Sequence, residues 1–332
     1  MLLILGLLMS ADAATDAAAE EDAPATPSVV AASDLPDLPE ELTSFGATRL
    51  GQTVYVYGGN TGSAHGYDRE GQSRTLWTLD LDAADRGWTA AGEGQHLQGN
   101  ALVAAGGRVV LLGGFKANNA PGEEQDLESL ATVRAWDPAA GQWSDLPPLP
   151  EPRSSFDAVA DGRTIYVVGG WKLTGDAETD WHRTAWSLDL TADSPAWQAL
   201  PEPPFQRRAL VAAMHNGRLY AIGGMTPEGP TVRVDVFDPA AGAWSRGPDL
   251  PGDGMNGFGG GAAVLGGQLV VTTFTGEVVR LNGDAWTVAG RAEPSRFFHR
   301  LVGDGDRSAL VIGGVNHDVG KFARVDRLTL PE

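Results

Sequence analysis

A short apolar segment that ends in a glycine pair recurs through this chain of 332 residues. The pairs are Gly58-Gly59, Gly113-Gly114, Gly169-Gly170, Gly223-Gly224 and Gly313-Gly314, and a sixth segment, QLVVTT, has Thr272-Thr273 in their place. Each is followed by a second apolar segment, such as LWTLDL or VRAWDP, then in most units by a tryptophan and a turn rich in proline and glycine. One structural unit therefore repeats along the chain.

Each unit holds about four short strands, because residues with high β propensity alternate with turn residues. Segments such as TVYVY and TIYVV are rich in valine, isoleucine and tyrosine. The chain has 44 glycines and 21 prolines, which is usual for many short strands joined by turns. Four strands that repeat at about 50 residues predict the blades of an all-β propeller.

The pattern resembles the kelch repeat, in which a glycine pair closes the second strand, an aromatic residue lies on the third and a tryptophan opens the fourth. The resemblance covers residues 28–330 and recurs in register. It implies strands that radiate from a crowded centre, where glycine lets two backbones approach. It also implies that the repeated tryptophans fill the space between neighbouring sheets; these are Trp88, Trp143, Trp197, Trp244 and Trp286.

The number of blades follows from the two ends of the repeat. The last unit stops at Leu330, after its third strand, so it lacks a fourth. Residues 32–47 align without gaps on residues 143–158, which places a fourth strand near residues 28–35. Pairing this strand beside residues 322–330 closes the ring and leaves no exposed edge. We therefore expect one six-bladed propeller domain over residues 28–332.

The N-terminus reads as a cleaved export signal. Residues 1–9, MLLILGLLM, are too short to span a bilayer, and small residues follow at signal-peptidase positions. Residues 1–13 are thus the expected signal peptide, and the alternative is a buried N-terminal segment. Residues 14–27 are rich in Ala, Asp, Glu and Pro and are the expected flexible linker. The prediction is an exported protein, periplasmic or secreted, with no membrane insertion after cleavage.

Charge and composition exclude several functions. The formal net charge is −19, which argues against a nucleic-acid partner, since such a partner needs a basic face. The chain has no cysteine, so disulfides, thiolate metal sites and a cysteine nucleophile are excluded. That absence also excludes a copper radical oxidase, which needs a cysteine cross-linked to a tyrosine. No spacing typical of a metal site stands out, and no cofactor is predicted.

The unusual residues concentrate on one face of the predicted propeller. On this face emerge the connections between second and third strands, long in blades 1, 2 and 3, and those that lead into each first strand. We call it the long-loop face and the opposite one the turn face. Long loops on a rigid scaffold are where binding usually resides. The predicted ligand-binding residues are Arg153, Arg207, Arg208, Arg296, Arg300, Trp171, Trp181, His65, Asn256 and His317.

Arginines beside tryptophans in an acidic protein favour an anionic ligand, such as a carboxylate-bearing sugar, because arginine binds carboxylates bidentately and tryptophan stacks on sugar rings. Each single arginine taken alone favours a structural role within the blades, and only the cluster as a whole is equally consistent with binding. For Trp171 and Trp181 the alternative, which is slightly favoured, is packing of their loop onto the rim.

Two functions from different classes remain open. In the first, the chain is a non-catalytic module that binds a glycan or a protein through the long-loop face. In the second, it resembles the periplasmic kelch mutarotases that epimerise N-acetylneuraminate, and Arg153 or Arg208 would fix the carboxylate. His299 or His182 would then move protons near neutral pH, where histidine titrates. We favour the binding module.

Overall fold

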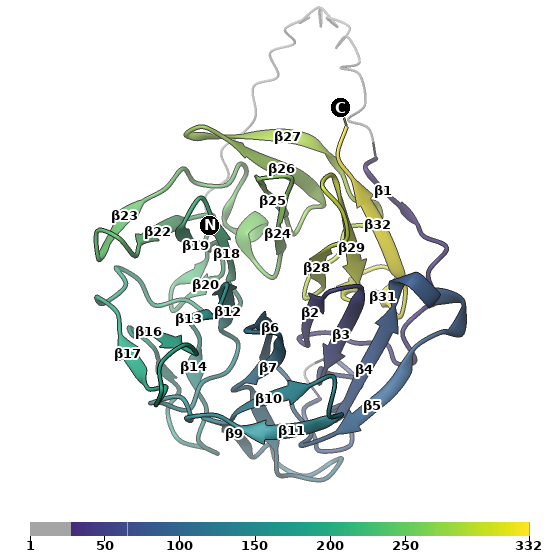
Figure 1. Cartoon of the computed structure of the whole chain (residues 1–332), viewed down its shortest axis with the longest axis vertical. Coiled ribbons are helices and arrows are strands. Elements are labelled where there is room, and N and C mark those ends of the chain that lie inside the picture. The colour runs from purple at the N-terminus through teal and green to yellow at the C-terminus, as the bar shows by residue number, and fades with distance from the viewer. Residues whose placement is uncertain (1–27, 65, 332) are drawn as a thin grey trace, which may run out of the picture.

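The computed structural model describes residues 28–64 and 66–331, so the predicted signal peptide, the predicted linker and His65 lie outside the described residues. Six four-stranded antiparallel sheets are arranged as blades around a central axis (Figure 1). The predicted six-bladed propeller is confirmed. Among the described residues, no helix is long and apolar enough to cross a membrane.

Blades 1 to 3 each take four consecutive main strands. Blade 1 is β2 (Gly46–Leu50), β3 (Thr53–Tyr57), β4 (Thr75–Asp80) and β5 (Thr89–Glu93). Blade 2 is β6 (Ala101–Ala105), β7 (Arg108–Leu112), β10 (Val133–Asp137) and β11 (Gln142–Asp145). Blade 3 is β12 (Asp157–Asp161), β13 (Thr164–Val168), β16 (Ala185–Asp189) and β17 (Trp197–Ala199).

Blades 4 and 5 follow the same order, and blade 6 combines both ends of the chain. Blade 4 is β18 (Val211–His215), β19 (Arg218–Ile222), β22 (Val234–Asp238) and β23 (Ala243–Arg246). Blade 5 is β24 (Gly261–Leu265), β25 (Gln268–Thr272), β26 (Glu277–Asn282) and β27 (Ala285–Arg291). Blade 6 is β28 (Arg300–Gly303), β29 (Ser308–Ile312), β32 (Val325–Thr329) and β1 (Val30–Ala32).

Four small hairpins and two short 3-10 helices interrupt the connections. The hairpins are β8 (Phe115–Ala117) with β9 (Leu127–Ser129), β14 (Trp171–Lys172) with β15 (Asp180–Trp181), β20 (Met225–Thr226) with β21 (Gly229–Pro230), and β30 (Val315–Asn316) with β31 (Gly320–Lys321). The 3-10 helices are η1 (Leu81–Arg86) and η2 (Gly254–Gly257). Each hairpin joins the second and third main strands of its blade, so blades 2, 3, 4 and 6 carry one.

The N-terminal strand closes the ring as predicted. Strand β1 pairs antiparallel with β32, and Val30 lies opposite Leu328. The first strands of neighbouring blades contact one another around the axis, including β28 of blade 6 against β2 of blade 1. Every main sheet thus has a neighbour on both sides, and the two ends of the chain are joined within one blade.

Each strand has the composition that its distance from the axis requires. The second strands, such as TVYVY and TIYVV, lie between two neighbouring sheets and are almost wholly buried. The first strands, such as ALVAA and VAAMH, contain many alanines because the sheets crowd together near the axis. The fourth strands, such as QWSD, are mostly exposed. The core therefore lies in the spaces between blades, as where Val110 of β7 packs in one cluster with Ile165 of β13.

The glycine pairs lie where neighbouring blades touch. The amide of Gly170 donates to the carbonyl of Arg207 at 2.7 Å, which joins blade 3 to the segment that enters blade 4. Gly170 has φ 89°, and a Cβ there would lie 2.6 Å from the carbonyl oxygen of Ser154. Only glycine fits this conformation and this approach without strain. The same inter-blade hydrogen bond recurs at the second glycine of each pair: Gly59, Gly114, Gly170, Gly224 and Gly314.

The repeated tryptophans are half-buried and fasten each fourth strand to the previous blade's connection. Four indole N–H groups donate to proline carbonyls: Trp88 to Pro36, Trp197 to Pro147, Trp244 to Pro201 and Trp286 to Pro248, at 2.8 to 3.0 Å. Trp143 has no such proline, and its ring packs edge-on against Trp136 and Tyr57. The indole of Trp143 is left without a hydrogen-bond partner.

Candidate functional site

The mouth of the channel on the long-loop face is closed to a small opening by a ring of backbone hydrogen bonds. Just before each first strand, one residue adopts a positive φ: Ser44, Gly99, Ser155, Ala209, Gly259 and Phe298. The amide of each donates to the carbonyl of the equivalent residue in the preceding blade, at 2.7 to 3.3 Å. Four of the six, Ser44, Ser155, Ala209 and Phe298, are residues other than glycine, for which a positive φ is strained, so the contacts between blades must hold this geometry.

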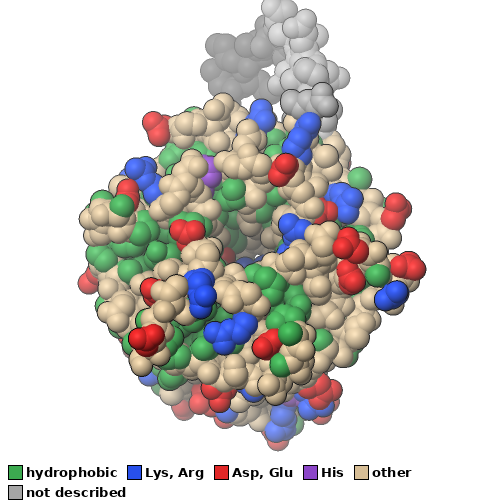
Figure 2. Space-filling view, viewed as in Figure 1, with side chains coloured by type: hydrophobic (Ala, Val, Ile, Leu, Met, Phe, Trp, Pro, Cys, Tyr) green, Lys and Arg blue, Asp and Glu red, His purple; other side chains and the backbone are tan. Residues whose placement is uncertain are grey.

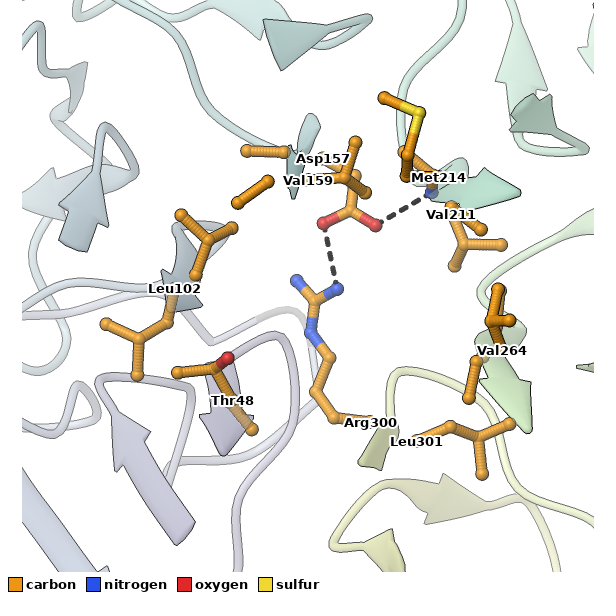
Figure 3. A pocket seen from close by; sticks show the side chains of 18 of the residues that line it. Thr48, Leu102, Asp157, Val159, Val211, Met214, Val264, Arg300 and Leu301 are labelled. Atoms are coloured by element: carbon orange, nitrogen blue, oxygen red, sulfur yellow. Dashed lines mark hydrogen bonds and ion pairs between the residues drawn. The ribbon is translucent and has the colours of Figure 1, made fainter. Parts of the chain in front are cut away.

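An ion pair crosses the channel directly below this ring. Asp157 is the first residue of β12 in blade 3, and Arg300 is the first residue of β28 in the opposite blade 6. Arg300 Nη1 lies 3.0 Å from Asp157 Oδ1, and Asp157 Oδ2 accepts the amide of Ala212 at 2.9 Å (Figure 3). Arg300 Nε donates to the carbonyl of Phe45 at 2.8 Å. The pair thus connects four blades and divides the channel into two parts.

The larger part of the channel extends from this ion pair between the first strands. It has a volume of about 370 Å³. Leu102, Val159, Val211 and Val264 project into it around the ion pair (Figure 3). In the space-filling view a hollow lies at the centre of the face shown, with charged side chains of both signs spread over the rim (Figure 2). The smaller part, about 60 Å³, lies at the ring itself.

Three of the predicted ligand-binding arginines are buried inside the blades. Arg153 and Arg207 are 0% exposed and Arg296 is 3% exposed. Each guanidinium donates to the carbonyl of the first glycine of its blade's pair: Arg153 to Gly169, Arg207 to Gly223 and Arg296 to Gly313. Each also contacts a carboxylate: Glu151, Asp235 and Asp326, respectively. These arginines clamp the glycine turn, and they do not converge at the mouth.

Burial changes the pKa values of these side chains. Desolvation lowers the pKa of Arg207 to about 10, and the neighbouring carboxylate of Asp235 acts in the opposite direction. The Nη2–Oδ2 distance of that pair is 2.7 Å. Because both groups are removed from water, the pair is costly to break from one side. The geometry supports the structural interpretation of Arg153, Arg207 and Arg296.

The two candidate catalytic histidines are also buried and away from solvent. His299 is 3% exposed, and its Nε2 lies 2.7 Å from Thr272 Oγ1. His182 is 5% exposed, and its Nε2 lies 3.0 Å from the carbonyl of Pro152. Burial lowers the pKa of His299 to about 3 and that of His182 to about 4, with nearby arginines acting in the same direction. Both are neutral near pH 7 and poorly placed to meet a substrate.

Arg208 is the predicted arginine that faces the mouth. It follows the buried Arg207 and points the other way, against the hairpin of blade 3. Its guanidinium carbon lies 4.1 Å from the ring centroid of Trp171 and 5.8 Å from that of Trp181. The two indoles pack edge to face with their centroids 5.4 Å apart. The structure thus brings together three of the predicted residues in one cluster.

Arg208 has no anionic partner within the part of the chain that the structure describes. No carboxylate of those residues forms an ion pair with it, and its Nε is buried without a hydrogen-bond partner, as is the Nε1 of Trp171. Burial lowers the pKa of Arg208, and Tyr67 acts in the opposite direction. A half-buried cation on an aromatic surface, with no counter-ion of its own, is suited to receive an external anion.

The long loops cover one side of this mouth. Asn119 of the blade 2 loop donates to the carbonyl of Tyr67 in the blade 1 loop at 2.9 Å. The amide of Ser129 in blade 2 donates to Leu173 in blade 3 at 3.0 Å. On the other side of blade 1, Lys321 of the blade 6 hairpin donates to the carbonyl of Asn60 at 3.0 Å. The loops of blades 6, 1, 2 and 3 therefore form a continuous hydrogen-bonded cover.

Blades 4 and 5 lie outside this cover. Blade 5 has no hairpin, and residues 273–276 alone connect β25 to β26. At the register position just before the positive-φ residue, blades 1 to 3 present Thr43, Gln98 and Ser154, all buried. Blades 4 to 6 present Arg208, Phe258 and Phe297 at that position, all half-buried. We call Arg208, Phe258, Phe297 and Phe274, together with Trp171 and Trp181, the open arc.

The phenylalanines of the open arc form a connected cluster of rings. Phe274 and Phe297 have centroids 4.9 Å apart, and Phe258 packs edge-on against Phe298 at 5.2 Å. Phe297 also contacts Phe298 at 5.2 Å. The predicted residue His317, which is exposed, lies 5.0 Å from Phe297. His317 therefore belongs to the edge of this cluster.

Asn256 lies under the surface of the open arc, in η2. It is 5% exposed, and its Nδ2 donates to the carbonyl of Pro251 at 3.0 Å. Its Oδ1 is buried without a partner. Among the described residues, no group of three His, Cys, Asp or Glu side chains is arranged to hold a metal ion.

Sequence reasoning missed Asp157 and the phenylalanines. The sequence did contain a pattern that indicates Asp157. Asp157 and Arg300 are the first residues of the first strands in opposite blades, and they carry opposite charges. The other four blades have uncharged residues at this position: Gly46, Ala101, Val211 and Gly261. The signal for Phe258 and Phe297 was their shared register with Arg208. Both signals become visible only when the six units are aligned on the residue with positive φ.

Comparison with known proteins agrees with this architecture. A family model described as the Kelch motif matches residues 97–150 and 206–251. Kelch-like protein 35 of Mus musculus is 27% identical over 221 residues, which is 65% of this chain and 33% of that protein. Kelch repeat and BTB domain-containing protein 13 of Homo sapiens is 32% identical over 208 residues, which is 60% of this chain and 43% of that protein. The chain thus spans less than half the length of these relatives.

A solved structure has the same fold over most of both chains. The structure of YjhT superposes with a TM-score of 0.71 at 17% sequence identity, and it covers 88% of this chain and 96% of that chain. At this identity the likeness establishes the fold alone.

Proposed function

This chain belongs to the kelch-repeat β-propeller proteins, and from that premise we propose that it is a binding module whose partner docks on the open arc of the long-loop face. The partner that the surface favours is a protein. Half-buried tryptophan and phenylalanine side chains beside an arginine are the residue types that dominate the energy of protein interfaces. Kelch propellers typically serve as protein-interaction modules, which agrees with this assignment.

The observation that carries the proposal is the unpaired guanidinium of Arg208 on Trp171. In the described part of the chain most arginines have carboxylate partners, whereas Arg208 has none and lies at the mouth. The acidic field of the whole protein repels an acidic partner, but salt screens it beyond about 8 Å at physiological ionic strength. A charge-assisted hydrogen bond in the shielded mouth is worth about 1.5–3 kcal/mol. The guanidinium of Arg208, and not the net charge of the protein, therefore decides which chemical group binds at the mouth.

An acidic sugar is the second candidate partner. The indoles of Trp171 and Trp181 supply flat apolar surfaces, and Arg208 supplies the cation that a sugar carboxylate needs. This candidate rests on the same three residues and needs none of the phenylalanines. We do not extend it to mutarotation, because His182 and His299 are buried and hydrogen-bonded within the blades.

We also propose that the protein works outside the cytoplasm. The apolar segment of residues 1–9 and the small residues that follow it support export by a cleaved signal peptide. Immunoblotting of fractionated cells for the N-terminally processed chain tests this proposal. Finding the uncleaved chain in the cytoplasm would contradict it.

Affinity capture with matched baits tests the binding function. The wild-type chain, an Arg208→Ala variant and an Arg218→Ala variant are compared by quantitative mass spectrometry of proteins captured from the source organism. Arg218 is an exposed arginine of the turn face, paired with Asp238, and serves as the control. The proposal predicts a partner that wild type and Arg218→Ala retain and that Arg208→Ala loses about 10-fold or more. Equal capture by all three baits would contradict it.

The sugar candidate is tested separately by thermal unfolding with N-acetylneuraminate, glucuronate and glucose. Ligand at 100 times its Kd adds about 2.7 kcal/mol to the stability of the folded state. An increase in Tm with the two acidic sugars alone, lost in Arg208→Ala, would favour the sugar. No change in Tm would leave the protein partner as the proposed ligand.

A further inference from the structure

The larger part of the central channel is a pocket with one closed end and one open end. At the closed end lie the hydrogen-bonded ring and the ion pair, and the first residue of the first strand is buried in five of the six blades. The fourth residue of every first strand is half-buried or exposed: Arg49, Ala104, Ala160, Met214, Val264 and Gly303. These residues precede the turns into the second strands, so the pocket opens on the turn face.

The wall of this pocket combines apolar side chains with uncharged backbone groups. Leu102, Val159, Val211 and Val264 surround the ion pair (Figure 3), and most other lining positions are alanine. Each first strand pairs with a second strand along one edge, so its other edge presents backbone N–H and C=O groups to the axis. Arg49 lies at the open end, where it donates to Gln52. A volume of about 370 Å³ suits a small molecule.

The closed end offers a donor and an acceptor whose charges cancel. The carboxylate of Asp157 accepts Arg300 on one oxygen and the amide of Ala212 on the other, so each oxygen keeps a free lone pair. Arg300 also donates to the carbonyls of Phe45 and Asn100, and two of its five N–H groups remain. Both side chains line the pocket and keep some exposed surface, 22% for Arg300 and 8% for Asp157.

From this arrangement we propose that the turn-face end of the channel binds a small uncharged molecule with an amide group and an apolar part. The amide carbonyl accepts from Arg300, the amide N–H donates to Asp157, and the apolar part contacts the valines and leucines of the wall. This site goes beyond the proposed function, because the ion pair and the ring separate it from the open arc.

The two charges of the ion pair decide between ligand classes. A carboxylate that approaches Arg300 also meets the negative charge of Asp157, and a cation that approaches Asp157 meets Arg300. A hydrocarbon fills the pocket but leaves the remaining donors and acceptors of the pair without partners, which is unfavourable. An amide satisfies a donor and an acceptor together and brings no charge.

Methyl NMR of the methionine-labelled chain tests the site, because Met214 lines the channel whereas Met225 lies on the long-loop face, bonded to Arg208. Four probes share one ring and differ in one group: benzamide, benzoate, benzamidine and toluene. Isovaleramide, with a smaller apolar part, covers the case in which the ring is too large. We expect an amide to shift the Met214 resonance saturably, to leave Met225 unchanged and to bind about 10-fold or more tightly than benzoate, benzamidine and toluene.

No shift of Met214 with either amide would overturn the site, and equal binding of toluene or benzoate would overturn the amide class. Val264→Trp fills the channel from its wall and should abolish the Met214 shift. Val288→Trp, on the outer strand of the same blade, is the matched control, since Val264 is 39% and Val288 49% exposed. An unchanged Met225 resonance shows that each variant is folded. Binding that survives Val264→Trp would also overturn the site.

A third variant tests the role of the ion pair. Asp157→Asn keeps the shape of the side chain and an acceptor for the amide of Ala212, but it leaves Arg300 without its carboxylate. Benzoate should then gain about 10-fold in affinity relative to benzamide. An unchanged order of affinities would overturn the assignment of the head group to this pair. None of these results depends on Arg208, so the capture experiment decides the proposed function separately.

Discussion

At the scale of single residues, two neighbouring arginines show how position in the chain decides role. Arg207 turns inward, donates to the carbonyls of Gly223 and Arg233 and pairs with Asp235. Arg208 turns outward onto Trp171 and has no carboxylate partner among the described residues. Neither role can be read from composition, because both side chains are chemically identical. Arg208 lies in an extended segment bridged to Met225, and consecutive side chains of such a segment point to opposite sides.

Replacement of the buried arginine is expected to be costly. Arg207→Met leaves Asp235 buried with Arg233 as its remaining partner and leaves the carbonyl of Gly223 without this donor. Breaking a buried pair from one side costs about 3–5 kcal/mol. Equilibrium unfolding in urea measures this loss, with Arg208→Ala as the comparison that removes an unpaired arginine. A loss below about 1 kcal/mol for Arg207→Met would contradict the structural role of Arg207.

The buried histidines predict how stability depends on pH. The pKa of His182 is lowered to about 4 in the folded state by burial, with Arg153 acting in the same direction. Between about pH 6 and pH 4 the unfolded chain therefore binds a proton at this position that the folded chain does not. The free energy of unfolding should fall as pH falls through this window, by about 1.4 kcal/mol per pH unit for this histidine.

His182→Gln removes this titration and should make the slope shallower by that amount, as measured by urea unfolding at several pH values. His317→Gln, which replaces an exposed histidine, is the control. An unchanged slope in His182→Gln would show that His182 is not buried and neutral as described.

At the scale of elements, the glycine pairs decide whether neighbouring blades can meet. The amide of Gly170 donates to Arg207 in the segment that enters blade 4, and the space beside its Cα is filled by Ser154 and Phe156 at the start of its own blade. Its φ of 89° is one that residues other than glycine rarely adopt. Gly242, in the turn between the third and fourth strands of blade 4, has a comparable φ of 61° but nothing within 4 Å of a Cβ. Substitutions at these two positions can therefore distinguish the effect of backbone strain from the effect of a steric clash.

Gly170→Ala should therefore destabilise the protein by about 3 kcal/mol or more, because strain and a clash act together. Gly242→Ala should lower the free energy of unfolding by only about 1 kcal/mol, because backbone strain acts there without a steric clash. Both losses can be measured from denaturant unfolding curves. Equal losses would mean that the close approach of Ser154 and Phe156 to Gly170 contributes nothing.

The elements were predictable from the sequence to different degrees. The second strands, the glycine pairs and the closing strand were predictable because each repeats a local pattern that needs no knowledge of the neighbouring blade. The hydrogen-bonded ring was not, because it depends on positive φ at Ser44, Ser155, Ala209 and Phe298, which no residue preference announces. The inward direction of Arg153 and Arg296 was likewise hidden, since it depends on where the glycine turn of the same blade lies.

At the scale of the whole molecule, the propeller is symmetric in its strands and asymmetric on its long-loop face. Loops of blades 6, 1, 2 and 3 are joined by hydrogen bonds into one cover, and blades 4 and 5 are left outside it. The structure brings Trp171, Trp181 and Arg208 together, and their role as binding residues stays a prediction. Arg153, Arg207 and Arg296 do not converge at the mouth, because each is buried in its own blade and donates to the glycine turn there.

Ring closure should make the short N-terminal strand important for the whole fold. Strand β1 pairs with β32 along three residues, and Val30 packs against the core between blades 5 and 6. A chain that begins at residue 36 should therefore unfold at a Tm about 5 °C or more below that of a chain that begins at residue 28. Equal Tm values for the two chains, measured by calorimetry, would show that closure through β1 adds no stability.

The central claim is that the partner binds the open arc of the long-loop face, and hydroxyl-radical footprinting of the complex with the captured partner tests it most directly. The account predicts that the partner protects Trp171, Trp181 and Phe274 from oxidation. Met214, which lines the central channel, and Tyr220, on the second strand of blade 4, should be oxidised at the same rate with and without the partner. Protection of Met214 or Tyr220 with no change at Trp171, Trp181 and Phe274 would contradict the account.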